Sequence, residues 1–223
     1  MMGSSYRDIR NRIGQEKMAQ LIELGRICEA KKGQLLFEEK EETGLCLLLE
    51  GYVSLFRESR TGENRIIFIC GPGELLNETV LENGIPGVSA KALSACRFLE
   101  LDPERIWEEM AASWELGRAV CASLARKTRR LYHQAGNTCG NYALEDHLTA
   151  RLWKLARDYG IAEEGGRRIP FDISVTMLSD MLGAKRESVS RLISAMKGSG
   201  LICMEKGSLL IPDMEKLREK MSV

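Results

Sequence analysis

The fold of the C-terminal third of this 223-residue chain is decided by the segment Ser179-Asp180-Met181-Leu182-Gly183-Ala184-Lys185-Arg186-Glu187-Ser188-Val189-Ser190-Arg191. It predicts the end of a short amphipathic helix, a glycine turn, and a second helix that begins with charged and polar residues. Two short helices joined in this way form a helix-turn-helix. Because the second helix of that motif enters the major groove of DNA, the segment points to a DNA-binding protein.

The second helix is predicted to divide into a buried face and an exposed face. In the first helix, predicted over residues 175–182, Leu178, Met181 and Leu182 are expected to face inward. The buried face of the second helix is predicted to hold Val189, Leu192, Ile193 and Met196, and Gly198 and Gly200 end the helix. Arginine pairs with guanine and glutamate accepts from the cytosine amino group, each pair discriminating by roughly 1–3 kcal/mol. We therefore predict DNA contacts by six residues near the start of the second helix: Lys185, Arg186, Glu187, Ser188, Ser190 and Arg191. The alternative interpretation is that these polar residues only form the solvent-exposed face of an ordinary helix.

The segments around the motif complete a winged helix-turn-helix. Residues 142–159 are predicted as a helix with Leu144, Leu148, Leu152 and Leu155 on one face. Residues 169–172 are predicted as a short strand, and residues 201–205 and 208–211 as the two strands of a wing around Lys206-Gly207. A last helix is expected after Pro212, with Asp213 as its N-cap.

The N-terminal part of the chain has a different pattern. Residues 6–30 are predicted as short helices. From Lys31 onward, β-rich runs at 34–37, 45–57, 65–70 and 89–101 alternate with turns at Gly33, Gly44, Gly51, 61–64 and 71–73. Strands at this spacing with tight turns predict an antiparallel sandwich or roll.

A long helix is predicted between these two parts. Asp102 is expected to be its N-cap and Pro103 its first helical residue, and the helix continues to about Asn137. Steps of three and four residues connect Trp114, Gly117, Cys121, Leu124, Thr128, Leu131, Ala135 and Thr138, which we call the seam. This is the spacing of a coiled-coil heptad, so we predict a homodimer through residues 110–138. A helix packed on its own roll would also need an apolar stripe. Residues 136–141 break the helix and are predicted to form a hinge.

The net charge of zero hides an uneven distribution. Residues 1–117 carry 14 Lys/Arg and 20 Asp/Glu, whereas residues 118–140 carry five basic residues and no acidic one. Those five flank the seam: Arg118, Arg126, Lys127, Arg129 and Arg130. The split suggests an acidic module joined to a part that can approach a polyanion. The longest apolar runs are about five residues, far short of the roughly 20 that a membrane helix needs, and no signal peptide is visible.

The residues that carry metal and redox chemistry are dispersed. The seven cysteines form no C-x2-C pair and are expected to be buried free thiols in a reducing cytoplasm: positions 28, 46, 70, 96, 121, 139 and 203. An iron–sulfur cluster needs clustered thiolates, and a metal enzyme needs several His or Glu ligands together. Haem usually needs a histidine in or near the roll, but His133 and His147 lie on helices beyond it. We find no nucleophile–base pair or phosphate loop, so we expect no enzyme, no metal site, no haem and no iron–sulfur cluster.

The segment Gly183-Ala184-Lys185-Arg186-Glu187-Ser188-Val189-Ser190-Arg191 resembles the G-x-[ST]-R-E-[ST]-V-[GS]-R signature of the CRP/FNR family of bacterial transcription factors. The resemblance covers nearly the whole chain, because Gly33, Gly51, Gly73, Glu78 and Ser89 match the cyclic-nucleotide-binding roll and the long helix matches the dimerisation helix. It implies that Glu187 and Arg191 are the principal base readers. Arg186 matches the cyclic-AMP receptor branch and Ser190 the fumarate-nitrate branch. Lys185 departs from the pattern, because the family has a serine or threonine there, which would cap the helix. The missing cap costs about 1 kcal/mol of helix stability. A lysine at this position could instead contact a DNA phosphate.

The segment Gly73-Glu74-Leu75-Leu76-Asn77-Glu78, which we call the cassette, resembles the phosphate-binding cassette of nucleotide-binding relatives. In those relatives the glutamate holds the ribose hydroxyl, and an arginine–serine pair ten residues on holds the cyclic phosphate. Glu78 and Ser89 match, but Val88 stands at the arginine position, and Lys91 lies too far along the strand to replace it. A buried phosphate without a cation is costly, so the resemblance implies that cyclic AMP is not the ligand.

A small organic effector is instead expected between the cassette and the long helix. Its predicted contacts are Leu76, Asn77, Glu78, Val88 and Ser89, with Thr128 and Tyr132 closing the site from the helix. Thr128 is a polar residue within the mostly apolar seam, and it could also pair across the dimer or bond its own helix backbone. Redox sensing and effector-independent control stay open as alternatives.

These observations predict an α+β protein with a jelly-roll-like antiparallel β-roll, a long dimerisation helix and a winged helix-turn-helix. The predicted domains are residues 1–105, 106–140 for the dimerisation helix and hinge, and 141–223. The expected function is a cytoplasmic, dimeric transcription regulator that binds a pseudo-palindromic double-stranded DNA operator, with RNA polymerase as a further partner and no membrane. The alternative is a ligand-binding or scaffold module whose helix-turn-helix mediates protein contacts.

Overall fold

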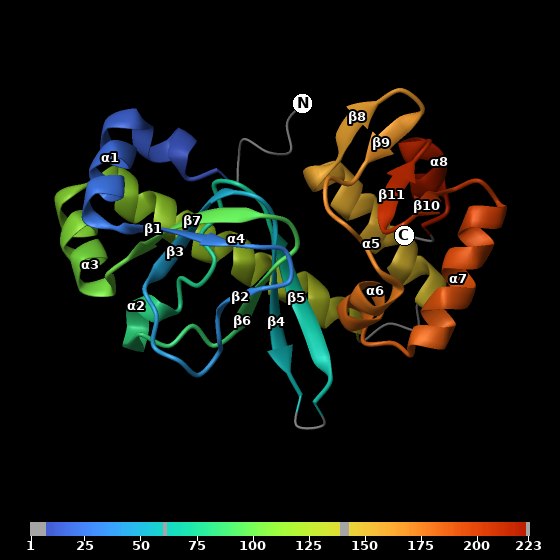
Figure 1. Ribbon diagram of the computed structural model, residues 1–223, viewed down its shortest axis with the longest axis horizontal. Coiled ribbons are helices and arrows are strands. Elements are labelled where there is room, and N and C mark those ends of the chain that lie inside the picture. The colour runs from blue at the N-terminus through green and yellow to red at the C-terminus, as the bar shows by residue number, and fades with distance from the viewer. Residues whose placement is uncertain (1–7, 60–61, 139–142, 222–223) are drawn as a thin grey trace. The chain divides into compact units, whose positions relative to one another are not determined.

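A computed structural model of the chain describes residues 8–59, 62–138 and 143–221, without the side chains of residues 137 and 138. The chain divides into two compact units, one within residues 1–57 and 67–139 and the other within residues 58–66 and 140–223 (Figure 1). Antiparallel sheets and helices in the first unit and a helix-turn-helix in the second confirm the predicted α+β class.

Among the described residues, two antiparallel sheets with strand orders β1-β7-β3 and β2-β6-β4-β5 lie in the first unit, except that the last residue of β4 and the first three of β5 fall in the bounds of the second. The strands are β1 (Arg26–Ala30), β2 (Leu35–Phe37), β3 (Leu45–Glu50), β4 (Val53–Glu58), β5 (Asn64–Cys70), β6 (Ser89–Ala92) and β7 (Cys96–Leu101). Apolar side chains from both sheets form one core, among them Leu48, Phe68 and Phe98. Gly51 has a φ of 88°, and a Cβ there would lie 2.3 Å from the carbonyl oxygen of Ala95, so the turn between β3 and β4 requires glycine.

The helices described in the first unit are α1 (Arg10–Leu24), α2 (Val80–Asn83), α3 (Pro103–Ala112) and α4 (Trp114–Thr138). A second core joins α1, α3 and the first half of α4 to the sheet of β3 and β7 through Leu21, Leu47, Leu99, Ile106 and Val120. The Asp102 carboxylate caps α3 as predicted, accepting from the amides of Glu104 (2.9 Å) and Arg105 (3.2 Å).

Two sequence predictions in this unit are corrected. Residues 6–30 were predicted as helices, but residues 26–30 form β1, which pairs with β7 along the edge of a sheet. Its outer residues are exposed, so it lacks the apolar alternation of an inner strand. The helical segment after Asp102 is also not continuous, because Ser113 has extended dihedrals (φ −131°, ψ 107°) and separates α3 from α4.

In its described residues, the second unit contains four helices and a four-stranded sheet with the order β10-β11-β9-β8. The elements are α5 (Leu144–Tyr159), β8 (Ile161–Glu163), β9 (Gly166–Arg168), α6 (Val175–Leu182), α7 (Arg186–Gly198), β10 (Cys203–Glu205), β11 (Ser208–Ile211) and α8 (Met214–Glu219). The predicted helix at 142–159 is confirmed from Leu144 onward, residue 142 lying outside the described residues, and the helices at 175–182 and after Asp213 and the wing are confirmed as well. Of the predicted hinge at residues 136–141, the part from residue 139 onward lies outside the described residues.

The strand predicted at residues 169–172 is wrong. Ile169, Phe171 and Ile173 are buried in alternation, as in a strand. Pro170, however, has no N–H to donate to a ladder, and the chain bends at residues 170 and 171. Ile169 and Ile173 donate single hydrogen bonds to the carbonyls of Leu209 and Gly207, but no strand forms here. The strand of this region is β9, which ends at Arg168, just before the predicted strand, and pairs with β8 and β11.

Candidate DNA interface and effector cassette

Helix α6 begins at a serine cap and ends at the glycine that makes the turn to α7. The Ser174 hydroxyl oxygen accepts from the Met177 amide (3.0 Å) and so caps the N-terminus of α6. Gly183 ends α6 in the left-handed conformation (φ 62°), and its amide donates to the carbonyl of Ser179 (2.7 Å). Both ends of α6 are therefore fixed by local hydrogen bonds, and Gly183 makes the turn into α7.

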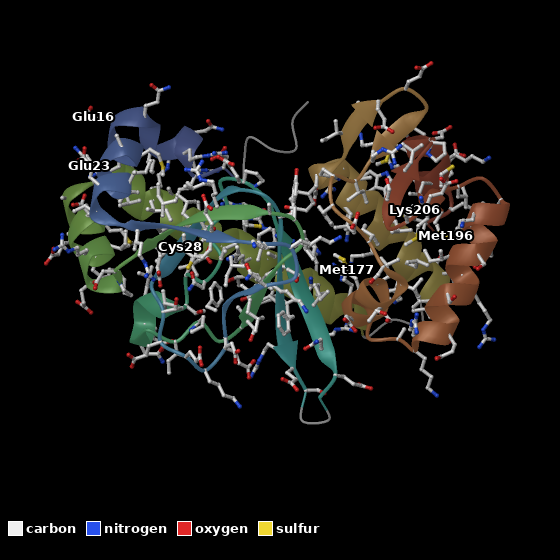
Figure 2. The ribbon with its side chains drawn as sticks, viewed as in Figure 1. Glu16, Glu23, Cys28, Met177, Met196 and Lys206 are labelled. Carbon is white, nitrogen blue, oxygen red and sulfur yellow. The ribbon has the colours of Figure 1, made fainter. Side chains whose placement is uncertain are left out.

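Helix α7 divides into the two faces expected from the sequence. Val189, Ile193 and Met196 are buried, and Figure 2 labels Met196 on this helix and Met177 on α6. The predicted DNA-contacting residues lie off that buried face: Lys185, Arg186, Glu187, Ser190 and Arg191 are exposed, and Ser188 is half-buried. Lys185 occupies the N-cap position and its side chain makes no capping hydrogen bond. The side chains that could read bases thus start at the first turn of the helix.

The wing ends in a tight turn that carries a lysine. Lys206 and Gly207 both have positive φ values (48° and 85°) between β10 and β11. Two such residues are typical of a two-residue hairpin turn, which glycine tolerates best. Lys206 is exposed at this tip (Figure 2), where it adds a positive charge to the wing.

The cassette is held against β3 by backbone and side-chain hydrogen bonds. The Asn77 side-chain oxygen accepts from the Cys46 amide (2.8 Å), and its NH2 group donates to the carbonyl of Gly44 (2.9 Å). The amide of Leu76 donates to the carbonyl of Cys46 (2.8 Å). Leu76 and Asn77 are buried. Both predicted effector contacts are therefore engaged in hydrogen bonds that hold the cassette in place.

Glu78 has a partner that the sequence analysis did not find. The Lys127 ammonium of α4 donates to a Glu78 carboxylate oxygen and to the carbonyl oxygens of Leu75 (2.9 Å) and Leu76 (3.1 Å). The Glu78 side chain is 1% exposed and that of Lys127 is 15% exposed. An ammonium has three N–H donors, and all three are accounted for here.

Two more residues of α4 reach the same unit on the same helix face. The Arg130 guanidinium lies 4.4 Å from the centre of the Phe68 ring and 4.0 Å from a Glu74 carboxylate oxygen. The Gln134 side-chain NH2 donates to the carbonyl of Ile67 (3.0 Å). Lys127, Arg130 and Gln134 follow each other by three and four residues, so α4 is joined to the cassette and β5 by polar contacts along one stripe.

The remaining predicted effector residues are not all brought together. Val88 packs against the core between the sheets, and the Ser89 hydroxyl oxygen accepts from the amide of Glu39 (3.0 Å). Thr128 and Tyr132 are exposed, Tyr132 at 73%, and neither makes a hydrogen bond to the cassette among the described residues. Within one chain, it is Lys127 that closes the cassette from α4.

The seam of α4 is exposed along the described part of the helix. Trp114 is 74% exposed, Leu131 is 43% and Leu124 is 38%, and Cys121, Thr128 and Ala135 are exposed too. Gly117 is half-buried. The opposite stripe, with Leu116, Val120 and Ser123, is buried against the roll. Helix α4 therefore has two stripes, one facing its own unit and one facing outward.

The cysteines only partly follow the expectation that all are buried. Cys46, Cys70 and Cys96 are buried, Cys28 is half-buried, and Cys121 and Cys203 are exposed; Cys139 lies outside the described residues. Burial raises the pKa of Cys70 to about 12 and raises the pKa of Cys46 further. These two thiols are therefore protonated at neutral pH and unreactive. Among the described residues, no three His, Cys, Asp or Glu side chains are grouped as a metal site would need.

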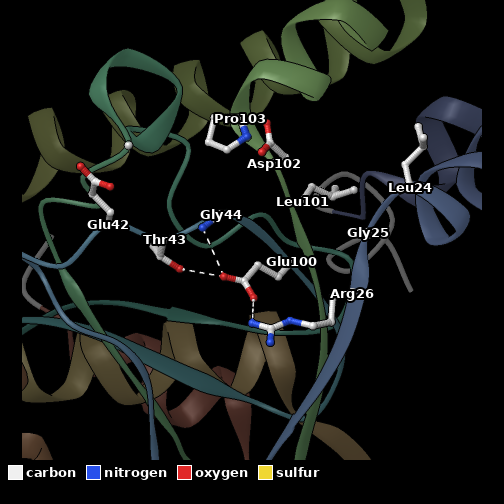
Figure 3. A pocket seen from close by; sticks show the side chains of 11 residues that line it. Leu24, Gly25, Arg26, Glu42, Thr43, Gly44, Glu100, Leu101, Asp102 and Pro103 are labelled. Atoms are coloured by element: carbon white, nitrogen blue, oxygen red, sulfur yellow. Dashed lines mark hydrogen bonds and ion pairs between the residues drawn. The ribbon is translucent and has the colours of Figure 1, made fainter.

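A second polar site lies in an open hollow of the first unit (Figure 3). The Glu100 carboxylate accepts from Arg26 (2.6 Å), from the Thr43 hydroxyl (3.2 Å) and from the Gly44 amide (3.3 Å). Burial alone would raise the pKa of Glu100, but these hydrogen bonds outweigh it and lower that pKa. Glu100 ties β7 to β1 and to the start of β3.

Comparisons with known proteins agree with this architecture. Residues 27–113 match the model of the cyclic nucleotide-binding domain, and residues 147–220 match that of the Crp-like helix-turn-helix domain. A CRP-like cAMP-activated global transcriptional regulator of Mycobacterium tuberculosis is 25% identical over 194 residues, covering 85% of each chain. The chain belongs to the CRP/FNR family of bacterial transcription regulators. The Cyclic AMP receptor protein of Thermus thermophilus is 27% identical over 176 residues, 78% of each chain.

Solved structures of CRP/FNR proteins show the same fold. CooA from Carboxydothermus hydrogenoformans superposes with a TM-score of 0.77 at 17% identity, covering 98% of this chain and 100% of that one. As a CRP/FNR member, the chain is a DNA-binding transcription regulator, and its family is one of regulators rather than enzymes. No helix within the described ranges is long and apolar enough to cross a membrane.

Proposed function

We propose that the chain is a homodimeric, cytoplasmic regulator that reads a pseudo-palindromic operator with α7 of each protomer. The observation that supports this most is the exposed start of α7, where Arg186, Glu187 and Arg191 stand off the buried face. These side-chain types form the base-specific pairs of the major groove. RNA polymerase is the further partner, and Lys185, Ser188 and Ser190 complete the DNA contacts.

The proposed dimer uses α4, within residues 110–138. Its seam carries exposed Trp114, Leu124 and Leu131 at heptad spacing, while the opposite stripe already packs on the roll. A large apolar stripe exposed on a helix is typical of an interaction surface. Dimerisation would set two copies of α7 about one helical turn of DNA apart. In the proposed division, residues 1–105 are the roll, 106–140 the dimerisation helix and hinge, and 141–223 the reader.

Selection of duplexes from a random pool with the full-length protein tests the DNA proposal. We expect an enriched sequence with two inverted half-sites centred about 10 base pairs apart. Affinity for it should fall steeply with salt, because each phosphate contact contributes roughly 0.9 to the log–log slope. A flat salt dependence with no enriched sequence would instead favour a scaffold module whose helix-turn-helix contacts proteins.

For the signal, we propose that control does not use cyclic AMP, although two relatives carry that nucleotide in their names. Val88 is neutral at the position implied for the phosphate-binding arginine, and Lys127 already donates all three of its protons. Calorimetric titration should show no binding. A Kd of about 1 μM or tighter, worth about −8 kcal/mol, would overturn this proposal.

Two modes of control fit a cassette without cyclic AMP. A small organic effector between the cassette and α4 would have to displace the Lys127 ammonium from Glu78. Control without a small effector needs no such displacement, so the observed contact favours it. Native mass spectrometry of the purified protein distinguishes the two, since a resident effector adds a defined mass to the folded chain.

A further inference from the structure

The acceptors around Lys127 form a cage that suits a primary ammonium group. One carboxylate oxygen of Glu78 and the carbonyl oxygens of Leu75 and Leu76 each receive one N–H. All three acceptors belong to one short loop, whereas the donor comes from α4, about 50 residues later in the chain. Cages made only of acceptors select donors that are positively charged and have several N–H groups.

Among the described residues, Lys127 is the cation that pairs with Glu78. The second carboxylate oxygen of Glu78 is buried and has no hydrogen-bond partner among the described residues. The Glu78 side chain is 1% exposed, so bulk solvent does little to stabilise its charge. A buried carboxylate that loses its cation is strongly destabilising, more so than a pair in which both members are replaced by neutral groups.

We propose that the cassette is a primary-ammonium site and that the chain fills it with its own Lys127. The lysine acts as an internal ligand, in the place between cassette and α4 where a small effector is expected. Because it is tethered, its effective concentration is on the order of millimolar or higher, and free amines do not displace it from the intact protein. The inference rests on the proposed control without cyclic AMP and adds which group occupies the cassette. It does not depend on DNA binding, because its readout is the stability of the roll.

The test removes the Lys127 ammonium from the cage by mutation and then supplies a free primary amine in solution. Lys127→Ala removes what amounts to a propylammonium group, and we expect the thermal midpoint to fall by roughly 6–20 °C. Addition of n-propylammonium chloride should restore part of that loss in a saturable way. Tetramethylammonium chloride at the same ionic strength has no N–H and should restore nothing. The same amine should leave Lys17→Ala unchanged, where a lysine of similar exposure pairs with Glu109 at 2.7 Å on the roll's helices.

Further variants and a wild-type measurement keep the inference testable. Glu78→Gln combined with Lys127→Ala should recover stability and lose the response to propylammonium. If Lys127→Ala folds but propylammonium acts no better than tetramethylammonium, the cage does not recognise ammonium and the inference is wrong. If Lys127→Ala does not fold, reductive methylation of the wild-type protein decides. Lys127 should then react at least about tenfold more slowly than exposed Lys40, because modification needs local opening. Equal rates would overturn the inference. Loss of operator binding alone would bear only on the proposed function.

Discussion

The exposed seam of α4 leads to a quantitative prediction about dimerisation. Leu124 and Leu131 are 38% and 43% exposed in the single chain. Full burial of a leucine side chain contributes about 1.5–3 kcal/mol, so the exposed share of each contributes roughly 0.6–1.2 kcal/mol when a partner covers it. Two copies of each residue meet in a dimer. Replacing both with alanine, which keeps only the Cβ, should therefore weaken association by roughly 2–4 kcal/mol, or about 30- to 1000-fold in Kd.

Analytical ultracentrifugation over a range of protein concentrations measures this Kd directly. Alanine is the best helix former, so Leu124→Ala/Leu131→Ala should leave the far-ultraviolet circular dichroism of the chain unchanged. Leu35→Ala is the matched control, because Leu35 is 46% exposed on β2 and lies outside α4. A wild-type protein that stays monomeric, or a double variant that dimerises as tightly as wild type, would refute the seam as the interface.

Three further changes test the scaffold around the proposed sites. Ser174→Ala removes the cap of α6 and should lower the free energy of unfolding by about 1 kcal/mol in a urea titration, whereas Ser174→Asn should retain most of it. Asn77→Ala leaves two backbone groups of the β3 region without their buried partners and should cost about 1–3 kcal/mol in the same assay. The pKa of Glu100 is lowered in the folded state by hydrogen bonds from Arg26 and Thr43, so its stabilising contribution is present above its ordinary pKa and is lost as the pH falls through the lowered value. Glu100→Gln should therefore flatten the acid side of a plot of thermal midpoint against pH; an unchanged slope would contradict this assignment.

The helix-turn-helix could be predicted almost completely from the sequence because its determinants are local. The bounds of α6 are those expected, and Gly183 has the positive φ that the tight turn requires. On α7, the apolar spacing of Val189, Ile193 and Met196 fixes which face is buried and therefore which side chains are exposed. The wing also follows from a local signal, since Lys206-Gly207 is a two-residue turn between alternating strands.

One error overlooked a local signal, and the others occurred where tertiary pairing overrides local pattern. The segment at residues 169–173 alternates as a strand does, but Pro170 removes the N–H that a ladder would need. Residues 26–30 form β1 because β7 supplies an edge to pair with, and nothing in their own periodicity requires it. The break at Ser113 likewise depends on how α3 and α4 pack on the roll.

Lys127 shows why the effector site was harder to predict. Its partner Glu78 is 49 residues away, and in the sequence Lys127 reads as one of five basic residues that flank the seam. Two signals could have indicated the pair. Lys127 continues the inward stripe of Leu116, Val120 and Ser123 by steps of three and four, and Glu78 lies in a cassette whose expected arginine is Val88. The cation expected at position 88 is absent, and Lys127 supplies one from the inward face of α4. Such a combination can be searched for in a sequence.

Operator discrimination by recognition-helix variants tests the central claim most directly. The measurement is the Kd for a shuffled duplex divided by the Kd for the selected duplex, by fluorescence anisotropy at fixed salt. For Glu187→Ala and for Arg191→Ala we predict that this ratio falls by about 5- to 150-fold, the equivalent of one base contact of roughly 1–3 kcal/mol. Lys197→Ala, on the exposed last turn of α7, is the control and should leave it unchanged. Full discrimination in both recognition-helix variants would contradict the assignment of α7 as the DNA reader.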